Sequence, residues 1–250
     1  MVDTIGWRMK FGIVTPSANS VVQPEYEAMR PPGVSNNVFR THVPNPELTS
    51  DRDWADIVSK IDAGIDDGVD QAMTCEPDHL ILGVSIESVW NGGQAASFRL
   101  AERIEKRAGG GIKVTQATEA IPEALKAFGA KRVALLTPYF PEAGNQAKGF
   151  VEEIGCEVVR IENLKLQRPT AIASAPADML RKAVASIDSK DIDAIVQFGA
   201  NLPMMAVAAD AERWLGKPVI AVNTATYWHA LRRNKITDKI YGCGRLLSEH

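Results

Sequence analysis

Two stretches of the chain share one pattern, in which an acidic residue precedes an apolar run that ends in small and polar residues. The first, DHLILGVSIES, runs from Asp78 to Ser88, and the second, DAIVQFGANL, runs from Asp193 to Leu202. A short apolar run that is partly β-branched is typical of a buried parallel strand. Ligands of open α/β sheets bind beyond the carboxyl ends of such strands. We therefore expect any chemistry to lie between the polar ends of these two stretches.

The rest of the chain alternates between strand-like and helix-like segments. Apolar residues recur at helical spacing from Trp54 to Met73, which predicts an amphipathic helix covering a sheet. Further helices are predicted over 21–29, 94–107, 118–128, 142–154, 177–187, 204–215 and 224–233. Strands are predicted over 9–14, 38–43, 112–114, 131–136, 157–161 and 219–222, and around Leu80 and Ile195, with 163–169 as a loop. This alternation predicts an α/β fold with two parallel-sheet lobes.

The second half of the chain repeats the strand ends of the first half in the same order. Thr15-Pro16 follows the first strand, and Thr137-Pro138 follows the first strand of the second half. The two glycine-containing strand ends come next in each half. Recurrence in a fixed order indicates an internal duplication. We expect two lobes that face each other, with these strand ends on one cleft.

Composition narrows the class of partner. The 250 residues are 45% apolar and 24% charged, and the net charge is −3. Such a composition is that of an ordinary globular protein. The small negative charge provides no basic field for nucleic acid or an anionic membrane. No apolar run reaches the roughly 18 residues of a membrane span. We expect a small-molecule ligand, no nucleic-acid partner and no membrane partner.

The cysteines and glycines suggest neither a disulfide framework nor a cofactor site. Cys75, Cys156 and Cys243 are scattered and odd in number, which is typical of reduced thiols in the cytoplasm. The run Gly109–Gly111 precedes a strand, whereas a phosphate loop follows a strand and opens a helix. No group of residues has the spacing of a metal site. The sequence therefore predicts a cytoplasmic protein without metal or cofactor.

Four motifs occur in a characteristic order. They are TPSAN at 15–19, LGVSIES at 82–88 with Asn91 and Gly92 after it, TPY at 137–139, and FGANLP at 198–203. Together they resemble the aspartate/glutamate/hydantoin racemase superfamily, and within it the branch of maleate cis–trans isomerases and arylmalonate decarboxylases. The resemblance covers nearly the whole chain and implies two pseudo-symmetric Rossmann-like lobes. It implies a first lobe of residues 1–117 plus 225–250 and a second of residues 118–224.

The chain departs from this branch at the catalytic cysteines. Racemases and isomerases of this type use one cysteine on each of two strand ends, and the decarboxylases keep only the second. The resemblance makes Val84 and Gly199 the corresponding positions here. Neither residue can form the thiolate that such chemistry requires. We expect the usual two-cysteine mechanism to be absent.

Neutral hydrogen-bonding groups are the candidates for binding a carboxylate. Asn19, Ser85, Tyr139 and Asn201 lie at the predicted strand ends, and the N–H groups of residues 199–201 could add an oxyanion-type site. The resemblance implies that Asn19, Tyr139 and Asn163 contact a substrate carboxylate. Alternatively, the asparagines serve only as turn residues and the tyrosine only packs. The expected apolar part of the site, together with the backbone at Gly199 and Ala200, consists of Val84, Ile86, Trp90 and Leu202.

Glu87 is the candidate proton donor or acceptor, because it directly follows the first of these strands. A carboxylate in a dry cleft has a raised pKa and can serve as a general acid or base. The alternative is a solvated glutamate at the start of a helix. Glu87 and Tyr139 are therefore our predicted catalytic residues.

Three function classes follow. The first is a cofactor-independent lyase that decarboxylates a small malonate-like or unsaturated diacid. The second is an isomerase or hydrolase acting on a similar diacid without cysteine, and the third is a non-catalytic sensor of small carboxylates. We rank them in that order. Oligomers are common among folds of this kind, so the chain could form a homo-oligomer.

Overall fold

The first sheet contains four parallel strands in the order β2-β1-β3-β4. Its strands are β1 (Met9–Pro16), β2 (Val34–Thr41), β3 (His79–Leu82) and β4 (Val114–Thr115). The computed structural model describes residues 3–90 and 92–250. β1 and β3 are central and almost wholly buried, as the apolar runs predicted for strands covered on both faces.

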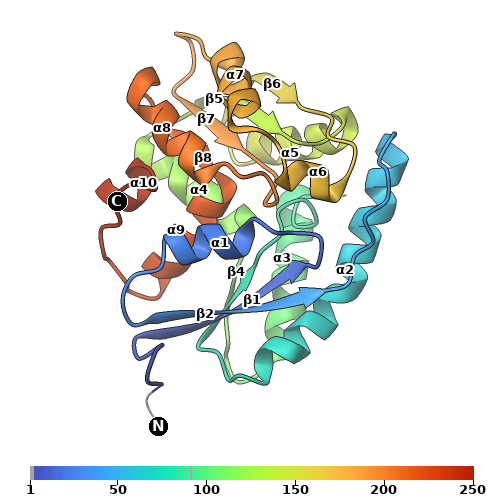
Figure 1. Ribbon diagram of the computed structural model, residues 1–250, viewed down its shortest axis with the longest axis vertical. Coiled ribbons are helices and arrows are strands. Elements are labelled where there is room, and N and C mark those ends of the chain that lie inside the picture. The colour runs from blue at the N-terminus through green and yellow to red at the C-terminus, as the bar shows by residue number, and fades with distance from the viewer. Residues whose placement is uncertain (1–2, 91) are drawn as a thin grey trace.

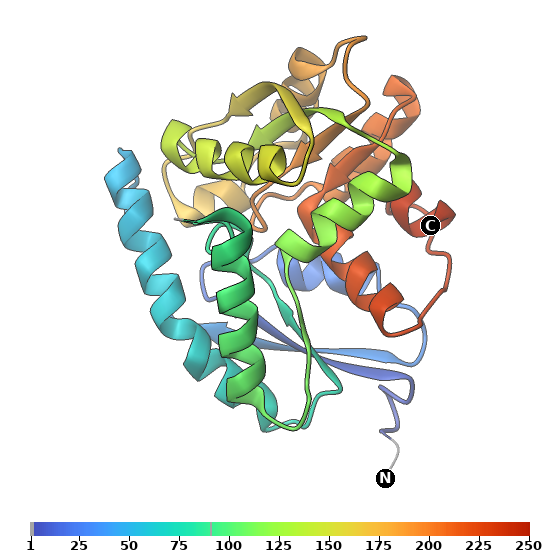
Figure 2. The same cartoon turned by 180° about the vertical axis from the view of Figure 1, so that it is seen from behind.

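Helices α2 (Asp51–Met73) and α3 (Gly93–Ala108) lie side by side on one face of this sheet (Figures 1 and 2). Ser50 begins α2 with a capping box, in which its side chain and that of Asp53 each accept a hydrogen bond from the other's backbone N–H. The stripe of apolar residues that the sequence pattern predicted is buried along α2. Helix α1 (Val22–Ala28) lies on the other side and packs against α9 (Val222–Arg233).

The second sheet has the same organisation, β6-β5-β7-β8, and again all its strands are parallel. Its strands are β5 (Arg132–Thr137), β6 (Glu157–Asn163), β7 (Ala194–Gln197) and β8 (Val219–Ala221). The remaining helices are α4 (Ala117–Phe128), α5 (Pro141–Glu153), α6 (Pro169–Ala173), α7 (Ala177–Ile187), α8 (Met205–Leu215) and α10 (Arg245–Glu249). Figure 1 shows one sheet above the other. The predicted α/β fold with two parallel sheets is confirmed, whereas the lobe boundaries stay a prediction.

The identical strand orders place the ligand-binding position of each sheet. β1 lies between β2 and β3, and β5 lies between β6 and β7, so each sheet has a switch point beside its first strand. Loops diverge there and leave a crevice at the carboxyl ends of the strands. The Thr-Pro loops and the glycine-containing strand ends predicted to share a cleft all leave from these two positions.

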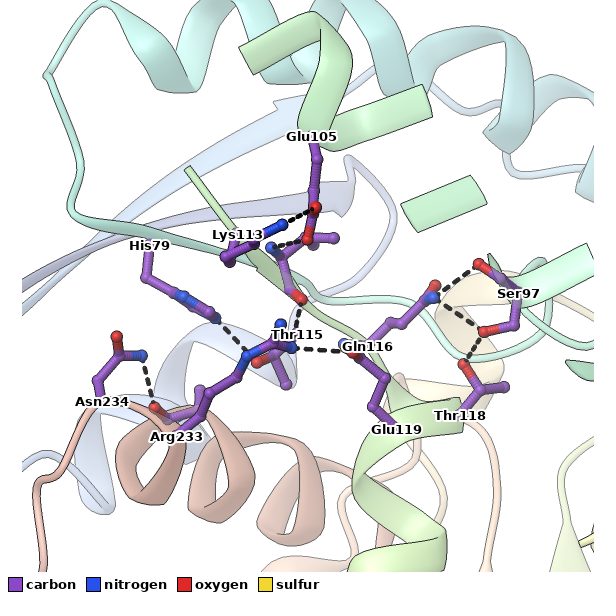
Figure 3. Close-up of polar contacts among 12 residues, drawn as sticks. His79, Ser97, Glu105, Lys113, Thr115, Gln116, Thr118, Glu119, Arg233 and Asn234 are labelled. Atoms are coloured by element: carbon purple, nitrogen blue, oxygen red, sulfur yellow. Dashed lines mark hydrogen bonds and ion pairs between the residues drawn. The ribbon is translucent and has the colours of Figure 1, made fainter. Parts of the chain in front are cut away.

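The chain passes from the first sheet to the second directly after β4, where a partly buried polar network holds it (Figure 3). Gln116 donates to the carbonyl and the hydroxyl of Ser97, each at 2.8 Å. Arg233 of α9 donates to Val114 O at 3.1 Å and to Glu119 Oε1 at 2.8 Å. These bonds tie α4 and α9 to the end of β4. His79 Nε2 lies 2.8 Å from Thr115 Oγ1 in the same network.

The structure differs from the predicted elements most in β2, α6 and α10, and the bounds of several other elements shift by one to three residues. β2 begins at Val34 and not at residue 38, because Val34 already pairs with Met9 of β1 although the intervening asparagines do not read as a strand. Helices α6 and α10 were not predicted, since each spans only five residues and neither shows a helical apolar period. In the described ranges, no helix has the length and apolar character that crossing a membrane requires.

Gly68 in α2 gives a test of how closely this helix packs on the sheet, and Gly149 in α5 is its control. A Cβ at Gly68 would lie 2.5 Å from Val14 Cγ1, whereas a Cβ at Gly149 in α5 would meet no atom within 4 Å. We expect Gly68→Ala to lower the free energy of unfolding by about 1–3 kcal/mol through overpacking. The control Gly149→Ala should raise it by roughly 0.5–1 kcal/mol, because alanine favours a helix. Urea denaturation measures both, and equal stability of the two variants would contradict the packing described.

Candidate active site

A cavity of about 60 Å³ lies between the facing strand ends. A buried water needs about 10–15 Å³ of such space, so the cavity suits a small ligand. None of the side chains lining it is charged. The lining residues are Pro16, Ala18, Asn19, Val43, Trp54, Ile57, Ile61, Val84, Ser85, Ile86, Pro138, Tyr139, Pro169, Ile172, Gly199, Ala200 and Asn201.

The polar end of the cavity is centred on the hydroxyl of Ser85. The backbone N–H groups of Gly199 and Ala200 donate to Ser85 Oγ at 3.1 and 3.2 Å, across the boundary between the two sheets. Tyr139 Oη lies 3.2 Å from the same oxygen. Ser85 and Tyr139 are both buried. The structure thus brings together the serine, the tyrosine and the backbone groups that the sequence suggested.

The directions of these hydrogen bonds follow from the donors present. A hydroxyl oxygen has two lone pairs and one proton. Because two N–H groups occupy the lone pairs of Ser85 Oγ, its proton is left for Tyr139 Oη. The proton of Tyr139 then points away from Ser85. Since Tyr139 lines the cavity, a ligand oxygen is its available acceptor. Burial raises the pKa of Tyr139, so the phenol keeps this proton.

An apolar wall of the cavity comes from α2 and α6. Trp54, Ile57 and Ile61 lie in the first half of α2, and the Trp54 ring meets that of Tyr139 edge-on with centroids 4.8 Å apart. With 23 residues α2 is about 35 Å long, whereas the eight residues of β1 span about 27 Å. The first turns of α2 therefore extend past the strand ends. The sequence pattern predicted that this apolar stripe packs only on the sheet. The length of the helix, which exceeds that of the strands, could have indicated that its first turns line the cavity.

The two asparagines lining the cavity use their amide groups differently. Asn19 Oδ1 accepts from Val21 N at 2.9 Å and Val22 N at 3.0 Å, which caps the start of α1. Its Nδ2 donates to no acceptor in the described part of the chain, so it is the group left for a ligand. Asn201 has no such donor, because Nδ2 donates to Ala18 O at 3.2 Å and to Pro169 O at 2.7 Å. In this structure the Asn201 side chain joins the loops around the cavity, and its predicted contact with a carboxylate stays a prediction.

Three other residues predicted for the site lie outside the lining. Asn163 Oδ1 accepts from Thr137 Oγ1 at 2.6 Å, so this amide is held against the end of β5. Leu202 is completely buried in the core, and Trp90 packs against the core from its margin. The neighbouring Asn91 lies outside the described residues. The apolar positions Val84 and Ile86, and the backbone of Gly199 and Ala200, do line the cavity.

Glu87 is buried next to the cavity without lining it. Only 6% of its surface is exposed, and neither carboxyl oxygen has a hydrogen-bond partner among the described residues. Burial, with a smaller contribution from the negative charge of Asp62, raises the pKa of Glu87 to about 8. The side chain is therefore neutral at pH 7 and carries a proton. The alternative of a solvated helix-start glutamate is wrong, because the side chain is removed from water.

The three cysteines all lie away from the cavity. At Gly199, a side chain would meet an obstacle. The φ angle is +107°, a value that residues with a Cβ rarely adopt, and a Cβ would lie 2.5 Å from Pro138 Cδ. The backbone here thus favours glycine. Within residues 3–90 and 92–250, no three His, Cys, Asp or Glu side chains are grouped to hold a metal ion.

The sequence profile of the arylmalonate decarboxylase family matches residues 12–247. The chain belongs to this family. It is 27% identical to a maleate isomerase of Nocardia farcinica over 250 residues, covering 96% of both chains. It is 29% identical to an arylmalonate decarboxylase of Bordetella bronchiseptica over 175 residues, covering 68% of this chain and 70% of that one. Enzymes of this family act on small carboxylates.

Solved structures of the family share the fold. A maleate cis–trans isomerase from Nocardia farcinica, a cysteine mutant with a covalently bound succinylcysteine intermediate, matches with a TM-score of 0.87 and 25% identity over 97% of this chain and 99% of that one. A crystal structure of arylmalonate decarboxylase matches with a TM-score of 0.76 and 21% identity over 96% of this chain and all of that one. The predicted membership of this branch is confirmed.

The buried Glu87 predicts how stability depends on pH. Its pKa is about 8 in the folded protein, against 4.5 for an ordinary glutamate. Between these values the folded state holds a proton that the unfolded chain releases, so stability falls as pH rises. In Glu87→Gln this part of the fall should be lost, which makes the variant more stable than wild type at pH 8 by up to a few kcal/mol. Urea denaturation at pH 5 and pH 8 measures the difference, and parallel profiles would contradict it.

The backbone conformation at Gly199 predicts that a cysteine at this position destabilises the protein. We expect Gly199→Cys to lower the free energy of unfolding by about 2–5 kcal/mol, from the positive φ and the contact with Pro138. Ala200→Cys is the matched control, since Ala200 also lines the cavity and already has a Cβ. Adding Pro138→Ala to Gly199→Cys should recover part of the loss. Thermal denaturation measures all three, and a Gly199→Cys variant as stable as Ala200→Cys would contradict the prediction.

Proposed function

We propose that the protein is a cofactor-independent lyase that decarboxylates a small malonate-type acid bearing an apolar substituent. The observation that carries the proposal is the division of the cavity into one polar end and apolar walls. Membership of the arylmalonate decarboxylase family supports the reaction class. The lack of any charged side chain in the lining supports an acid held by neutral donors.

The polar end would hold the carboxylate that stays on the product. In the proposal, its oxygens take the place of Ser85 Oγ as acceptors for the N–H groups of Gly199 and Ala200. The hydroxyls of Ser85 and Tyr139 and the amide Nδ2 of Asn19 donate as well. Aligned donors of this kind stabilise the charge that moves onto these oxygens when the carbon–carbon bond breaks.

The carboxylate that leaves would face the apolar wall. Val84, Ile86 and the α2 residues Ile57 and Ile61 offer it no hydrogen bond. A carboxylate without solvation is destabilised, whereas carbon dioxide is neutral and is not. Breaking the bond leaves its electron pair on the α-carbon, delocalised into the carboxylate at the polar end.

A proton must then reach the α-carbon to give the monocarboxylate product. Glu87 is the proposed source, because its raised pKa keeps it protonated at neutral pH. Its carboxyl group lies behind the lining, so the proposal requires Tyr139 or a water molecule to relay the proton. The two groups lie close enough to interact, since ionisation of Glu87 would raise the pKa of the phenol, which burial already raises.

Two other functions are outcomes of the same test. The similarity to a maleate isomerase, which extends over 96% of this chain, favours a cis–trans isomerase or hydrolase that works without cysteine. The position of Glu87 behind the lining favours a non-catalytic binder of small carboxylates.

Proton NMR in D₂O on phenylmalonate, methylmalonate and maleate distinguishes the three functions. Loss of a carboxyl group with deuterium uptake supports the lyase, and conversion of maleate alone supports the isomerase or hydrolase. Ligand-induced thermal stabilisation without turnover supports the binder and would overturn our proposal.

A pair of tyrosine variants tests the role of the phenol. Tyr139→Phe removes the proton that faces the cavity, and we expect it to lower kcat/KM for phenylmalonate roughly 10²–10³-fold, as for an oxyanion donor. Tyr227→Phe is the control, because Tyr227 is also buried and its hydroxyl donates to Asn36 Oδ1 at 3.0 Å, outside the cavity lining. Activity is followed by release of carbon dioxide. Equal losses in the two variants would show that Tyr139 acts only through packing.

A further inference from the structure

The loop after β7 presents several backbone N–H groups to the cavity, and buried side-chain amides hold its carbonyl groups on the opposite side. Gln197 Nε2 donates to Phe198 O at 2.6 Å and to Gly199 O at 2.9 Å. Asn223 Nδ2 donates to Ala200 O at 2.9 Å. Three successive carbonyl groups therefore accept from two side chains that the proposed chemistry does not use, and Gly199 O also accepts from Leu202 N at 2.9 Å.

Because the peptide bond is planar, the direction of each carbonyl group also sets the direction of the N–H group that follows it. In a trans peptide the C=O and the following N–H point in opposite directions. Holding Phe198 O and Gly199 O toward Gln197 therefore directs the N–H groups of Gly199 and Ala200 the other way, where they meet Ser85 Oγ. By the same geometry, holding Ala200 O toward Asn223 directs the N–H of Asn201 away from Asn223.

Both amides are fixed in orientation by their other contacts. Gln197 is 1% exposed, and its Oε1 accepts from Val222 N at 3.3 Å. Asn223 is 2% exposed, and its Nδ2 also donates to Glu25 Oε2 at 2.7 Å. Each Nδ2 or Nε2 thus faces only acceptors, which excludes a flipped amide.

Glu25 anchors this arrangement to the first sheet. Its Oε1 accepts from Met205 N at 2.9 Å at the start of α8, while Oε2 holds Asn223. Glu25 lies on α1, the helix that Asn19 caps from the cavity. The same buried carboxylate therefore connects the helix behind Asn19 with the loop that carries Ala200.

We propose that Gln197 and Asn223 are positioning residues: Gln197 aims the N–H groups of Gly199 and Ala200 at the bound carboxylate, and Asn223 aims that of Asn201. The inference rests on the proposed function in that it takes the ligand to be a carboxylate. The orientation of the peptides is a property of the free protein and is measured without turnover. Each side chain controls its own part of the loop.

Amide hydrogen exchange followed by ¹⁵N NMR tests this division. Gln197→Met removes the donor and keeps the size of the side chain, and exchange at Gly199 and Ala200 should rise roughly tenfold or more, as for loss of about 1.4 kcal/mol of constraint. Asn223→Asp replaces the donor nitrogen with oxygen, and the largest rise should be at Asn201. The affinity for phenylmalonate should fall roughly tenfold in both variants.

Gln116→Met is the matched control. Gln116 is as buried as Gln197 and also donates its Nε2 to a backbone carbonyl, that of Ser97, but in the network at the end of β4 (Figure 3). It should leave exchange at residues 199–201 unchanged.

Unchanged exchange in Gln197→Met, or an equal rise at all three positions in both variants, would overturn the proposal. If Gln197→Met does not fold, Asn223→Asp decides alone: a rise centred on Asn201 supports the proposal, and a uniform rise or none refutes it. Failure to bind or convert phenylmalonate with the expected exchange pattern would reject the proposed function and leave the positioning intact.

Discussion

The hydrogen bonds from the N–H groups of Gly199 and Ala200 to Ser85 Oγ join the two halves of the molecule at the cavity. Each half contributes what the other lacks: β3 leads to a hydroxyl, and β7 leads to a pair of backbone donors. The bonds form only because the two sheets have the same strand order and present the same edge to one another. Asn201 reinforces this junction, since its side chain joins the loops on both sides.

The electrostatics of the site follow from burial without compensating charge. Among the described residues, no charged side chain lines the cavity, and the buried acids Glu25 and Glu87 lie outside its lining. Burial raises the pKa of Glu25 to about 7 and that of Glu87 to about 8. Glu25 is held by two hydrogen bonds, whereas Glu87 has none among the described residues. The first therefore suits a structural anchor, and the second suits a group that gives up a proton.

The residue type and the shape of the loop are connected at Gly199. With φ at +107° and Pro138 at its side, this position favours a residue without a Cβ. The space that a side chain would occupy is taken by the proline of the TPY segment. The donors of this loop are consequently backbone groups alone, and their directions depend on the side chains that hold the carbonyl groups.

The sequence by itself determined the alternation of strands and helices, the two matching sheets and the polar strand ends that form the site. These features are local, because apolar period and turn residues report on neighbouring positions of the chain. It also placed Ser85, Tyr139 and Glu87 close to one another, since the carboxyl ends of parallel strands share an edge. Only the tertiary structure decided which atoms face the cavity. The cavity wall from α2 depends on the length of that helix. The hydrogen bonds that hold the amides of Asn201 and Asn163 depend on partners more than 25 residues away in sequence. The roles of Gln197 and Asn223 could not be read from the chain at all, because a buried amide gains its function only from the carbonyl groups that packing brings to it.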